Sequence, residues 1–293
     1  MKLTPHPELL VQPEWLEAHL GDSKVKVIDC TVFMTFQPVG PSKVESGRPQ
    51  WEEGHIPGAG YLHMVDDLSD PDGPFSYALP PPAHIAEKLR ALGVNDGDTI
   101  VLYGAGYPAV VTRAWWVLRA SGAPDVRLLD GGWERWVDEG RPVSSEAPKP
   151  ARGRFTGRRM LRMVADRAEV RAAIDNPSVS LMNALQPEQF EGTGGAHYGR
   201  PGRIPRSISV PVRALFDPDT RRFHDIPKLT EIFARSGALE AERIIPYCGG
   251  GIAASGSCFA LALVGHPEVA LYDGSLLDWA ADPALPMVTG KQD

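Results

Sequence analysis

The 293-residue chain has room for two domains and the composition of an ordinary globular protein, with 43% hydrophobic and 23% charged residues. Its net charge of −7 argues against nucleic acid or an anionic membrane surface as a partner. No apolar run approaches the roughly 20 residues that span a bilayer, and the first residues do not resemble a signal peptide. The three cysteines are too few for a disulfide framework, so we expect a reducing, cytoplasmic location.

The first half of the chain alternates predicted helices and strands. Hydrophobic spacing and proline positions predict, in order, a helix at 13–20, a strand at 25–29, a helix at 83–92, a strand at 99–103, a helix at 109–121 and a strand at 126–129. A polar stretch rich in glycine and proline separates the first strand from the second helix. This alternation predicts an α/β fold with a parallel sheet flanked by helices.

The second half of the chain repeats the first. Tyr247 follows Tyr103 by 144 positions, and Tyr272 follows Leu129 by 143, each within a similar local sequence. Between the halves lies a segment rich in Pro, Arg, Ser and Gly, which is typical of a linker. We therefore predict an N-terminal domain at 8–142, a linker at 143–160 and a C-terminal domain at 161–290.

Cys248 stands at the most informative position in the chain. It follows the predicted strand 243–245, precedes three consecutive glycines, and lies just before a predicted helix at 255–264. Glycines allow successive amides to turn toward one point, and such a nest at a helix N-terminus attracts an anion. The same environment favours a thiolate. The sequence therefore predicts that Cys248 is a nucleophile, although a lone cysteine is more often a buried structural residue.

These motifs resemble those of tandem-domain rhodanese-family sulfurtransferases. The resemblance spans about residues 8–290. It rests on three kinds of motif: Gly54-His55-Ile56-Pro57-Gly58-Ala59, the Cys248 loop, and the two similar motifs that begin at Asp130-Gly131 and Asp273-Gly274. It implies two rhodanese-like domains, of which the first is catalytically silent, since Gly104 stands where a cysteine would be. It also implies sulfur transfer from a small anionic donor through a persulfide on Cys248.

In the family, a six-residue loop cradles the persulfide, and here it would comprise Cys248, Gly249, Gly250, Gly251, Ile252 and Ala253. The uncharged loop is closer to the 3-mercaptopyruvate type than to the thiosulfate type, whose loop carries cations. The acceptor would be a thiol or cyanide, with a thioredoxin-like protein as one candidate. The resemblance implies neither a metal nor an organic cofactor.

The chain departs from the 3-mercaptopyruvate type at several positions. Gly250 replaces a relay serine, while Leu185 and Glu191 stand where arginines bind the substrate carboxylate. Tyr77 stands near the place of a relay histidine, and Asp66 is aligned with the relay aspartate.

Three nearby arginines are candidate replacements for the missing cations: Arg200, Arg203 and Arg206. We predict that Arg203, with Arg200 or Arg206, holds the anionic end of the donor; the alternative is a solvated basic loop. Tyr107 follows the loop that begins at Gly104, which we call the silent loop. It either lines the cleft between the domains or packs in their interface. Cys30 and Cys258 are predicted to be structural.

Two other functions remain open at this point. A cysteine phosphatase or arsenate reductase also uses a cysteine in an anion-binding loop, but needs an arginine at the loop's end, where Ala253 and Ala254 stand. A non-catalytic, regulatory relative would keep the fold and lose the relay residues. The retained cysteine favours the sulfurtransferase.

Overall fold

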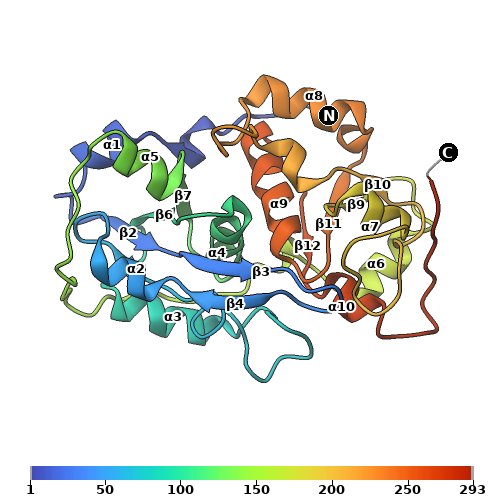
Figure 1. Ribbon diagram of the computed structural model, residues 1–293, viewed down its shortest axis with the longest axis horizontal. Coiled ribbons are helices and arrows are strands. Elements are labelled where there is room, and N and C mark those ends of the chain that lie inside the picture. Colours follow the sequence, from blue (N-terminus) through green and yellow to red (C-terminus); the bar gives the residue numbers. More distant parts are fainter. Residues whose placement is uncertain (1, 292–293) are drawn as a thin grey trace.

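The computed structural model describes residues 2–291 and contains two halves of the same architecture. In Figure 1 the N-terminal half, blue to green, lies on the left, and the C-terminal half, yellow to red, lies on the right. Each half has its own parallel sheet, and the two sheets do not interleave. The predicted α/β class and the internal repeat are therefore confirmed.

The sheet of the N-terminal half has five parallel strands in the order β1-β7-β6-β2-β5. Its strands are β1 (Leu10–Val11), β2 (Val25–Asp29), β5 (Gly60–Tyr61), β6 (Thr99–Tyr103) and β7 (Asp125–Leu129). Its helices are α1 (Pro13–Ala18), α2 (Arg48–Glu53), α3 (Pro82–Ala91), α4 (Pro108–Ala120) and α5 (Gly132–Asp138), after a 3-10 turn η1 (Pro7–Leu9). The buried, continuous hydrophobic run of β6 suits a central strand covered on both faces.

The C-terminal half repeats this order with shorter ladders. Its strands are β8 (Val164–Ala165), β9 (Val179–Asn183), β10 (Ile208–Ser209), β11 (Arg243–Tyr247) and β12 (Leu271–Tyr272). A single parallel bridge between Ile244 and Val269 joins the pair β8-β12 to the trio β11-β9-β10. Its helices are α6 (Arg167–Ala173), α7 (Pro187–Glu191), α8 (Ile226–Arg235), α9 (Ile252–Val264) and α10 (Ser275–Trp279), with 3-10 turns η2 (Leu161–Met163), η3 (Val212–Leu215) and η4 (Ala238–Glu240).

The halves meet mainly through α4 and α9, which lie between the two sheets in Figure 1. Small residues at the start of α9 allow close approach, so the hydroxyl oxygens of Thr112 and Ser255 lie 2.9 Å apart. Farther along, the rings of Trp115 and Phe259 meet edge to face, with centroids 5.1 Å apart. A single hydrophobic cluster runs through this contact and joins the two halves.

An antiparallel hairpin crosses from the N-terminal half to the C-terminal half. Its strands, β3 (Val32–Thr35) and β4 (Lys43–Ser46), lie in the stretch for which the sequence predicted no element. The hairpin runs along the lower front of the molecule in Figure 1. At its tip, the Gly40 amide donates to the His197 carbonyl at 2.9 Å, and the His197 amide donates to the Pro38 carbonyl at 3.1 Å. The hairpin therefore spans the gap between the halves.

The segment 143–160 contains no helix or named strand. It is nevertheless packed against the N-terminal half: Phe155 is buried, and the Met160 amide donates to the Ala120 carbonyl at 2.9 Å. None of the helices within residues 2–291 is long and apolar enough to cross a membrane.

Candidate active site

Cys248 directly follows strand β11 and begins the loop that leads into α9, as the sequence predicted. Two contacts from the start of α10 fix its backbone. The Cys248 amide donates to the Ser275 hydroxyl at 3.0 Å, and the Leu276 amide donates to the Cys248 carbonyl at 3.1 Å. The residue is only 2% exposed, so a reactant must reach its sulfur through a cavity.

Glycine is required at two positions of the loop for different reasons. Gly251 is the N-cap of α9 and has φ = +81°, a left-handed conformation that strains other residues. A Cβ on Gly249 would lie 1.9 Å from Cζ of Tyr198, whose ring covers this part of the loop. Backbone geometry therefore explains Gly251, and close packing explains Gly249.

The amides of this loop are open to an anion. Those of Gly249, Gly250 and Gly251 make no hydrogen bond within residues 2–291. The next amides, of Ile252 and Ala253, open α9, where helical geometry leaves N–H groups without an intrahelical partner. Unpaired amides and the positive end of a 13-residue helix together favour negative charge beside Cys248.

The other two cysteines have no such environment. All three cysteines are free and buried. Burial raises the pKa of the Cys30 and Cys258 thiols, and the neighbouring negative charge of Cys248 raises that of Cys258 further. Both therefore remain protonated thiols at neutral pH, which fits their predicted structural role.

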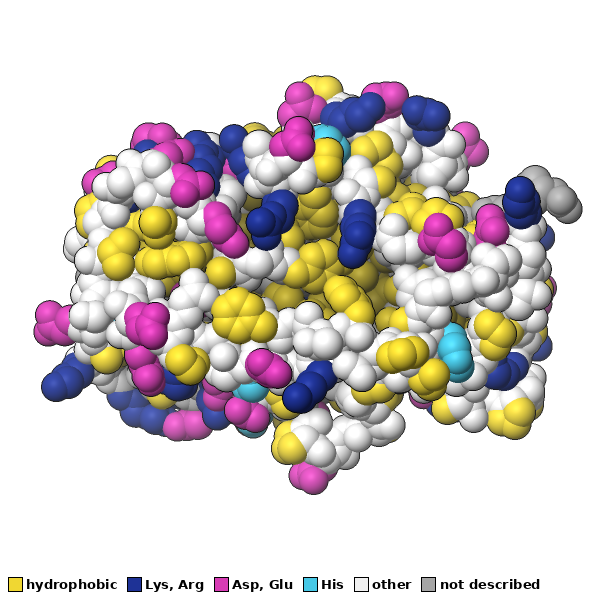
Figure 2. All heavy atoms as spheres, in the orientation of Figure 1, with side chains coloured by type: hydrophobic (Ala, Val, Ile, Leu, Met, Phe, Trp, Pro, Cys, Tyr) yellow, Lys and Arg dark blue, Asp and Glu magenta, His cyan; other side chains and the backbone are white. Residues whose placement is uncertain are grey.

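A cavity of about 350 Å³ opens over Cys248 and is walled by both halves of the molecule. The N-terminal half contributes the hairpin residues Met34 and Phe36, and the C-terminal half contributes Leu185 and Leu277. In Figure 2 the face between the halves is hollowed at its centre, with a largely hydrophobic floor. This is the predicted interdomain cleft, with Cys248 inside it.

Three tyrosines also line the cleft: Tyr77, Tyr107 and Tyr198. The Tyr77 hydroxyl donates to the Ser42 carbonyl of the hairpin, which ties the hairpin to the cleft wall. Tyr198 lies over the loop, and burial raises the pKa of its hydroxyl, an effect that the nearby Gln189 side chain partly offsets. Tyr107 lines the cleft, which was the first of the two roles that the sequence suggested for it.

The structure does not bring the three predicted arginines to this cleft. Arg200 donates to four backbone carbonyls, including that of Leu285 at 2.9 Å. Arg203 is buried, donates to the Gly290 carbonyl at 2.7 Å and stacks on the Phe190 ring. Arg206 is exposed and borders a different cavity. The guanidiniums of Arg200 and Arg203 hold the C-terminal segment in place. None of the three predicted arginines lines the cleft, so the structure does not support the prediction that they hold the donor.

The predicted residue Asp66 also lies away from Cys248, and so does Glu191, which stands at an arginine position of the family. The Asp66 side chain is 77% exposed and pairs with Nδ1 of His63 at 2.7 Å, outside the residues that line the cleft. Glu191 ends α7 and is likewise not among the lining residues, whereas Leu185 is. The aspartate and histidine positions of the family relay are thus not reconstructed here by Asp66 and Tyr77.

Sequence reasoning missed Arg213, a cationic residue that lines the cleft. It lies in η3, just beyond the carboxyl end of β10, and its side chain is exposed. Its guanidinium makes no hydrogen bond or ion pair with any residue in 2–291. The available signal was position: ligands of parallel sheets bind at the carboxyl ends of strands.

A buried ion pair between the halves supports the loop from behind. Nη1 of Arg113, on α4, lies 2.7 Å from Oδ1 of Asp273, which follows β12. The other oxygen of Asp273 accepts the Leu79 amide at 2.7 Å, and Arg113 also donates to the Tyr77 carbonyl. A Cβ on Gly251 would lie 2.8 Å from this guanidinium, so the ion pair abuts the loop.

Comparison with known proteins agrees with this arrangement. The family model of the rhodanese-like domain matches residues 12–139 and 166–282, one match in each half. The chain belongs to the rhodanese-like family.

Among relatives of this rhodanese-like chain is a probable 3-mercaptopyruvate sulfurtransferase of Pseudomonas aeruginosa, 32% identical and covering 96% of this chain and 98% of its own. The 3-mercaptopyruvate sulfurtransferase of Escherichia coli is 29% identical, with 94% and 96% covered. The crystal structure of SseA from Escherichia coli superposes with a TM-score of 0.80 at 28% identity, covering 91% of this chain and 98% of SseA. The rhodanese-like chain is a tandem-domain sulfurtransferase, and the phosphatase-like and non-catalytic alternatives lose their support.

Proposed function

We propose that Cys248 carries the transferred sulfur as a persulfide. Its thiolate attacks the outer sulfur of a donor, an S–S bond forms, and the bond between that sulfur and the rest of the donor breaks. The observation that carries this proposal is that the amides of Gly249, Gly250 and Gly251 are unpaired within residues 2–291 and lie beside Cys248, which lines the cleft. These amides stabilise the anionic persulfide until an acceptor removes the outer sulfur.

The donor proposed here is small and anionic, of the 3-mercaptopyruvate type, with thiosulfate as the second candidate. The cavity of about 350 Å³ suits a small molecule. An anion in a largely apolar cleft needs a positive partner, and Arg213 offers one whose guanidinium is not engaged within residues 2–291. Two relatives named for 3-mercaptopyruvate support the first candidate.

The proposed acceptor is a thiol or cyanide, and a thioredoxin-like protein is one physiological possibility. A relative from Thermus thermophilus, 28% identical, is named a sulfur carrier protein, which supports a protein acceptor. Because Cys248 is nearly buried, a protein must present its thiol on a projecting segment that enters the cleft. Three free thiols fit a reducing compartment, and we propose the cytoplasm.

The test is to load the protein with a donor and weigh it intact. Wild type should gain one sulfur atom, and Cys248→Ser should gain none and lose transfer to an acceptor thiol, because a hydroxyl does not form the persulfide. Cys30→Ser and Cys258→Ser are matched controls that should keep the added sulfur. A persulfide that persists in Cys248→Ser, with the fold intact by circular dichroism, would contradict the assignment.

A further inference from the structure

The N-terminal half, which we call the silent half because Gly104 stands where a cysteine would be, contributes a tyrosine to the cavity over Cys248. Tyr107 is the N-cap of α4, the position that Gly251 holds at the start of α9, 144 residues later. Its side chain lines the same cavity as Cys248 and Arg213, and its ring meets Phe36 edge to face with centroids 6.2 Å apart. The silent loop thus contributes a polar group to the catalytic cleft.

The hydroxyl of Tyr107 is the uncommitted one among the three cleft tyrosines. The Tyr77 hydroxyl donates a hydrogen bond to the Ser42 carbonyl, and the pKa of the Tyr198 hydroxyl is influenced by the nearby Gln189 side chain. The Tyr107 hydroxyl has no hydrogen-bond partner in the described part of the chain, residues 2–291. Burial raises its pKa, the negative charge of Cys248 raises it further, and Arg213 opposes both. Tyr107 therefore stays protonated at neutral pH and can give up a proton only to a strong base.

An α-keto thiol donor generates such a base. When the C–S bond of 3-mercaptopyruvate breaks, its electron pair moves onto the keto group and leaves an enolate, which needs a proton. Family enzymes of the 3-mercaptopyruvate type have a relay serine and a relay histidine. Here Gly250, at the serine position, has no side chain, and the hydroxyl of Tyr77, near the histidine position, is hydrogen-bonded to the Ser42 carbonyl. Thiosulfate makes no comparable demand, because its leaving group is the stable anion sulfite.

We infer that the Tyr107 hydroxyl is the proton donor to the enolate that leaves when Cys248 takes sulfur from an α-keto thiol. The inference rests on the proposed function. In this step the Cys248 thiolate forms an S–S bond, the donor's C–S bond breaks, and the Tyr107 proton goes to the enolate oxygen, giving the enol of pyruvate. The tyrosinate then recovers a proton from the S–H of the new persulfide, which is left as the anion held by the loop amides. With Arg213 holding the carboxylate, the donor is bound at one end and protonated near the other.

The test compares donors in Tyr107→Phe, which removes the hydroxyl and keeps the ring. Single-turnover persulfide formation on Cys248 is followed by rapid quench and intact mass, with 3-mercaptopyruvate, thiosulfate and inorganic polysulfide. General acid catalysis contributes about 10²–10⁴-fold, so we expect a loss of at least about 100-fold with 3-mercaptopyruvate. Thiosulfate and polysulfide should load the variant as they load wild type, because their leaving groups need no proton.

Tyr198→Phe is the matched control, since it removes another cleft hydroxyl; any loss it causes should be the same for every donor. An equal loss across donors in Tyr107→Phe, or no loss with 3-mercaptopyruvate, would overturn the role of Tyr107. Wild type that loads from thiosulfate or polysulfide but not from 3-mercaptopyruvate would also overturn it, while leaving the persulfide on Cys248 in place. Wild type that loads from none of the three would instead overturn the proposed function.

Discussion

The loop after β11 and the loop after β6 occupy equivalent places in the two sheets, but their amides have different partners. In the silent loop, the Ala105 amide donates to the Thr31 hydroxyl at 3.0 Å and the Gly106 amide donates to the Glu134 carboxylate at 2.8 Å. In the catalytic loop, the three glycine amides are unpaired within residues 2–291. A cavity of about 500 Å³ borders the silent loop as well, so a cavity alone does not distinguish the two.

The difference lies in the residues that face each loop. Leu185 stands where the silent half has Thr31: each donates its amide to the side chain at the end of the preceding strand, at 2.8 Å and 2.7 Å. Leu277 stands where the silent half has Glu134. Leu277 lies five residues after Tyr272, and Glu134 lies five residues after the equivalent Leu129. Two apolar side chains therefore keep the catalytic amides free for an anion. In the silent half, two of the three equivalent amides are paired, and Gly104 stands in place of the cysteine.

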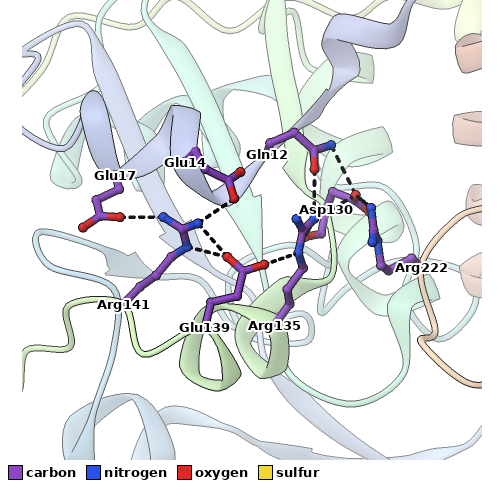
Figure 3. A network of polar contacts seen from close by, with 8 residues as sticks. All are labelled: Gln12, Glu14, Glu17, Asp130, Arg135, Glu139, Arg141 and Arg222. Atoms are coloured by element: carbon purple, nitrogen blue, oxygen red, sulfur yellow. Dashed lines mark hydrogen bonds and ion pairs between the residues drawn. The ribbon is translucent and has the colours of Figure 1, made fainter.

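The two halves are also joined by reciprocal ion pairs. Asp130 and Asp273 hold equivalent positions, and each binds an arginine of the other half, Arg222 and Arg113 respectively. Figure 3 shows that Asp130 keeps further partners, with Gln12 and Arg135 beside Arg222. Asp273 depends more heavily on its single arginine. The pair behind the catalytic loop is thus the more deeply buried and the less redundant.

The largest expected effect follows from breaking that pair. Arg113 is 0% exposed, and Arg113→Leu would leave the Asp273 carboxylate buried with the Leu79 amide as its one hydrogen-bond partner within residues 2–291. Removing one member of a buried ion pair typically costs 3–5 kcal/mol, so we expect a loss of about that size in the free energy of unfolding. Urea denaturation of both proteins measures it.

Arg222→Leu is the matched control for this prediction. Arg222 is 38% exposed, and Asp130 retains Arg135 at 3.1 Å. Its loss should cost about 1 kcal/mol or less, and salt should reduce the difference. Equal losses in the two variants would contradict the comparison of the two ion pairs.

The second effect, on activity, comes from giving the catalytic loop the silent half's carboxylate. Leu277→Glu copies Glu134 and should accept the loop amides while repelling the persulfide anion. Losing oxyanion-type stabilisation costs about 10²–10³-fold, and we expect a fall of that size in sulfur transfer with the fold intact. Steady-state rates with an acceptor thiol measure it.

Leu277→Gln separates charge from shape in this test. The amide side chain has nearly the same size as the carboxylate but carries no negative charge, so its loss of transfer should be smaller. If Leu277→Glu keeps wild-type rates, the open amides do not hold the persulfide, and the difference between the two loops has another cause.

How far the sequence reached depends on whether a feature is local. The position of Cys248 between a strand and a helix, the repeat and the parallel sheets could be predicted, because strand–loop–helix order and glycine geometry are written in neighbouring residues. The hairpin β3–β4 was missed, because its strands have only four residues each and its tip is held by His197 from the other half. The three arginines were misplaced because nearness in sequence to a glycine-rich loop does not say which way a guanidinium points.

The smallest of these effects concerns the cation of the cleft. Arg213 stands where the silent half has Val65. Three residues before Val65, the Leu62 amide donates to the last carbonyl of β2 at 2.9 Å; three residues before Arg213, the Val210 amide donates to the last carbonyl of β9 at 3.0 Å. Arg213→Val copies the silent half and removes a charge-assisted contact to an anionic donor. Such a contact contributes about 1.5–3 kcal/mol, so kcat/KM for 3-mercaptopyruvate should fall about ten- to hundredfold.

The effect of Arg213→Val should depend on the donor's charge, because the guanidinium acts on the anionic end and not on the sulfur. An uncharged alkyl persulfide should therefore lose much less than 3-mercaptopyruvate. Arg206→Gln serves as the control and should leave kcat/KM unchanged, because Arg206 is exposed and lies outside the cleft. The residue has φ = +60°, and glutamine, like arginine, has a Cβ, so the backbone strain stays the same. If Arg206→Gln lowers kcat/KM and Arg213→Val does not, the donor binds at the loop that the sequence first indicated. A fall confined to Arg213→Val and to anionic donors places the specificity of the enzyme in a residue whose equivalent in the silent half is Val65.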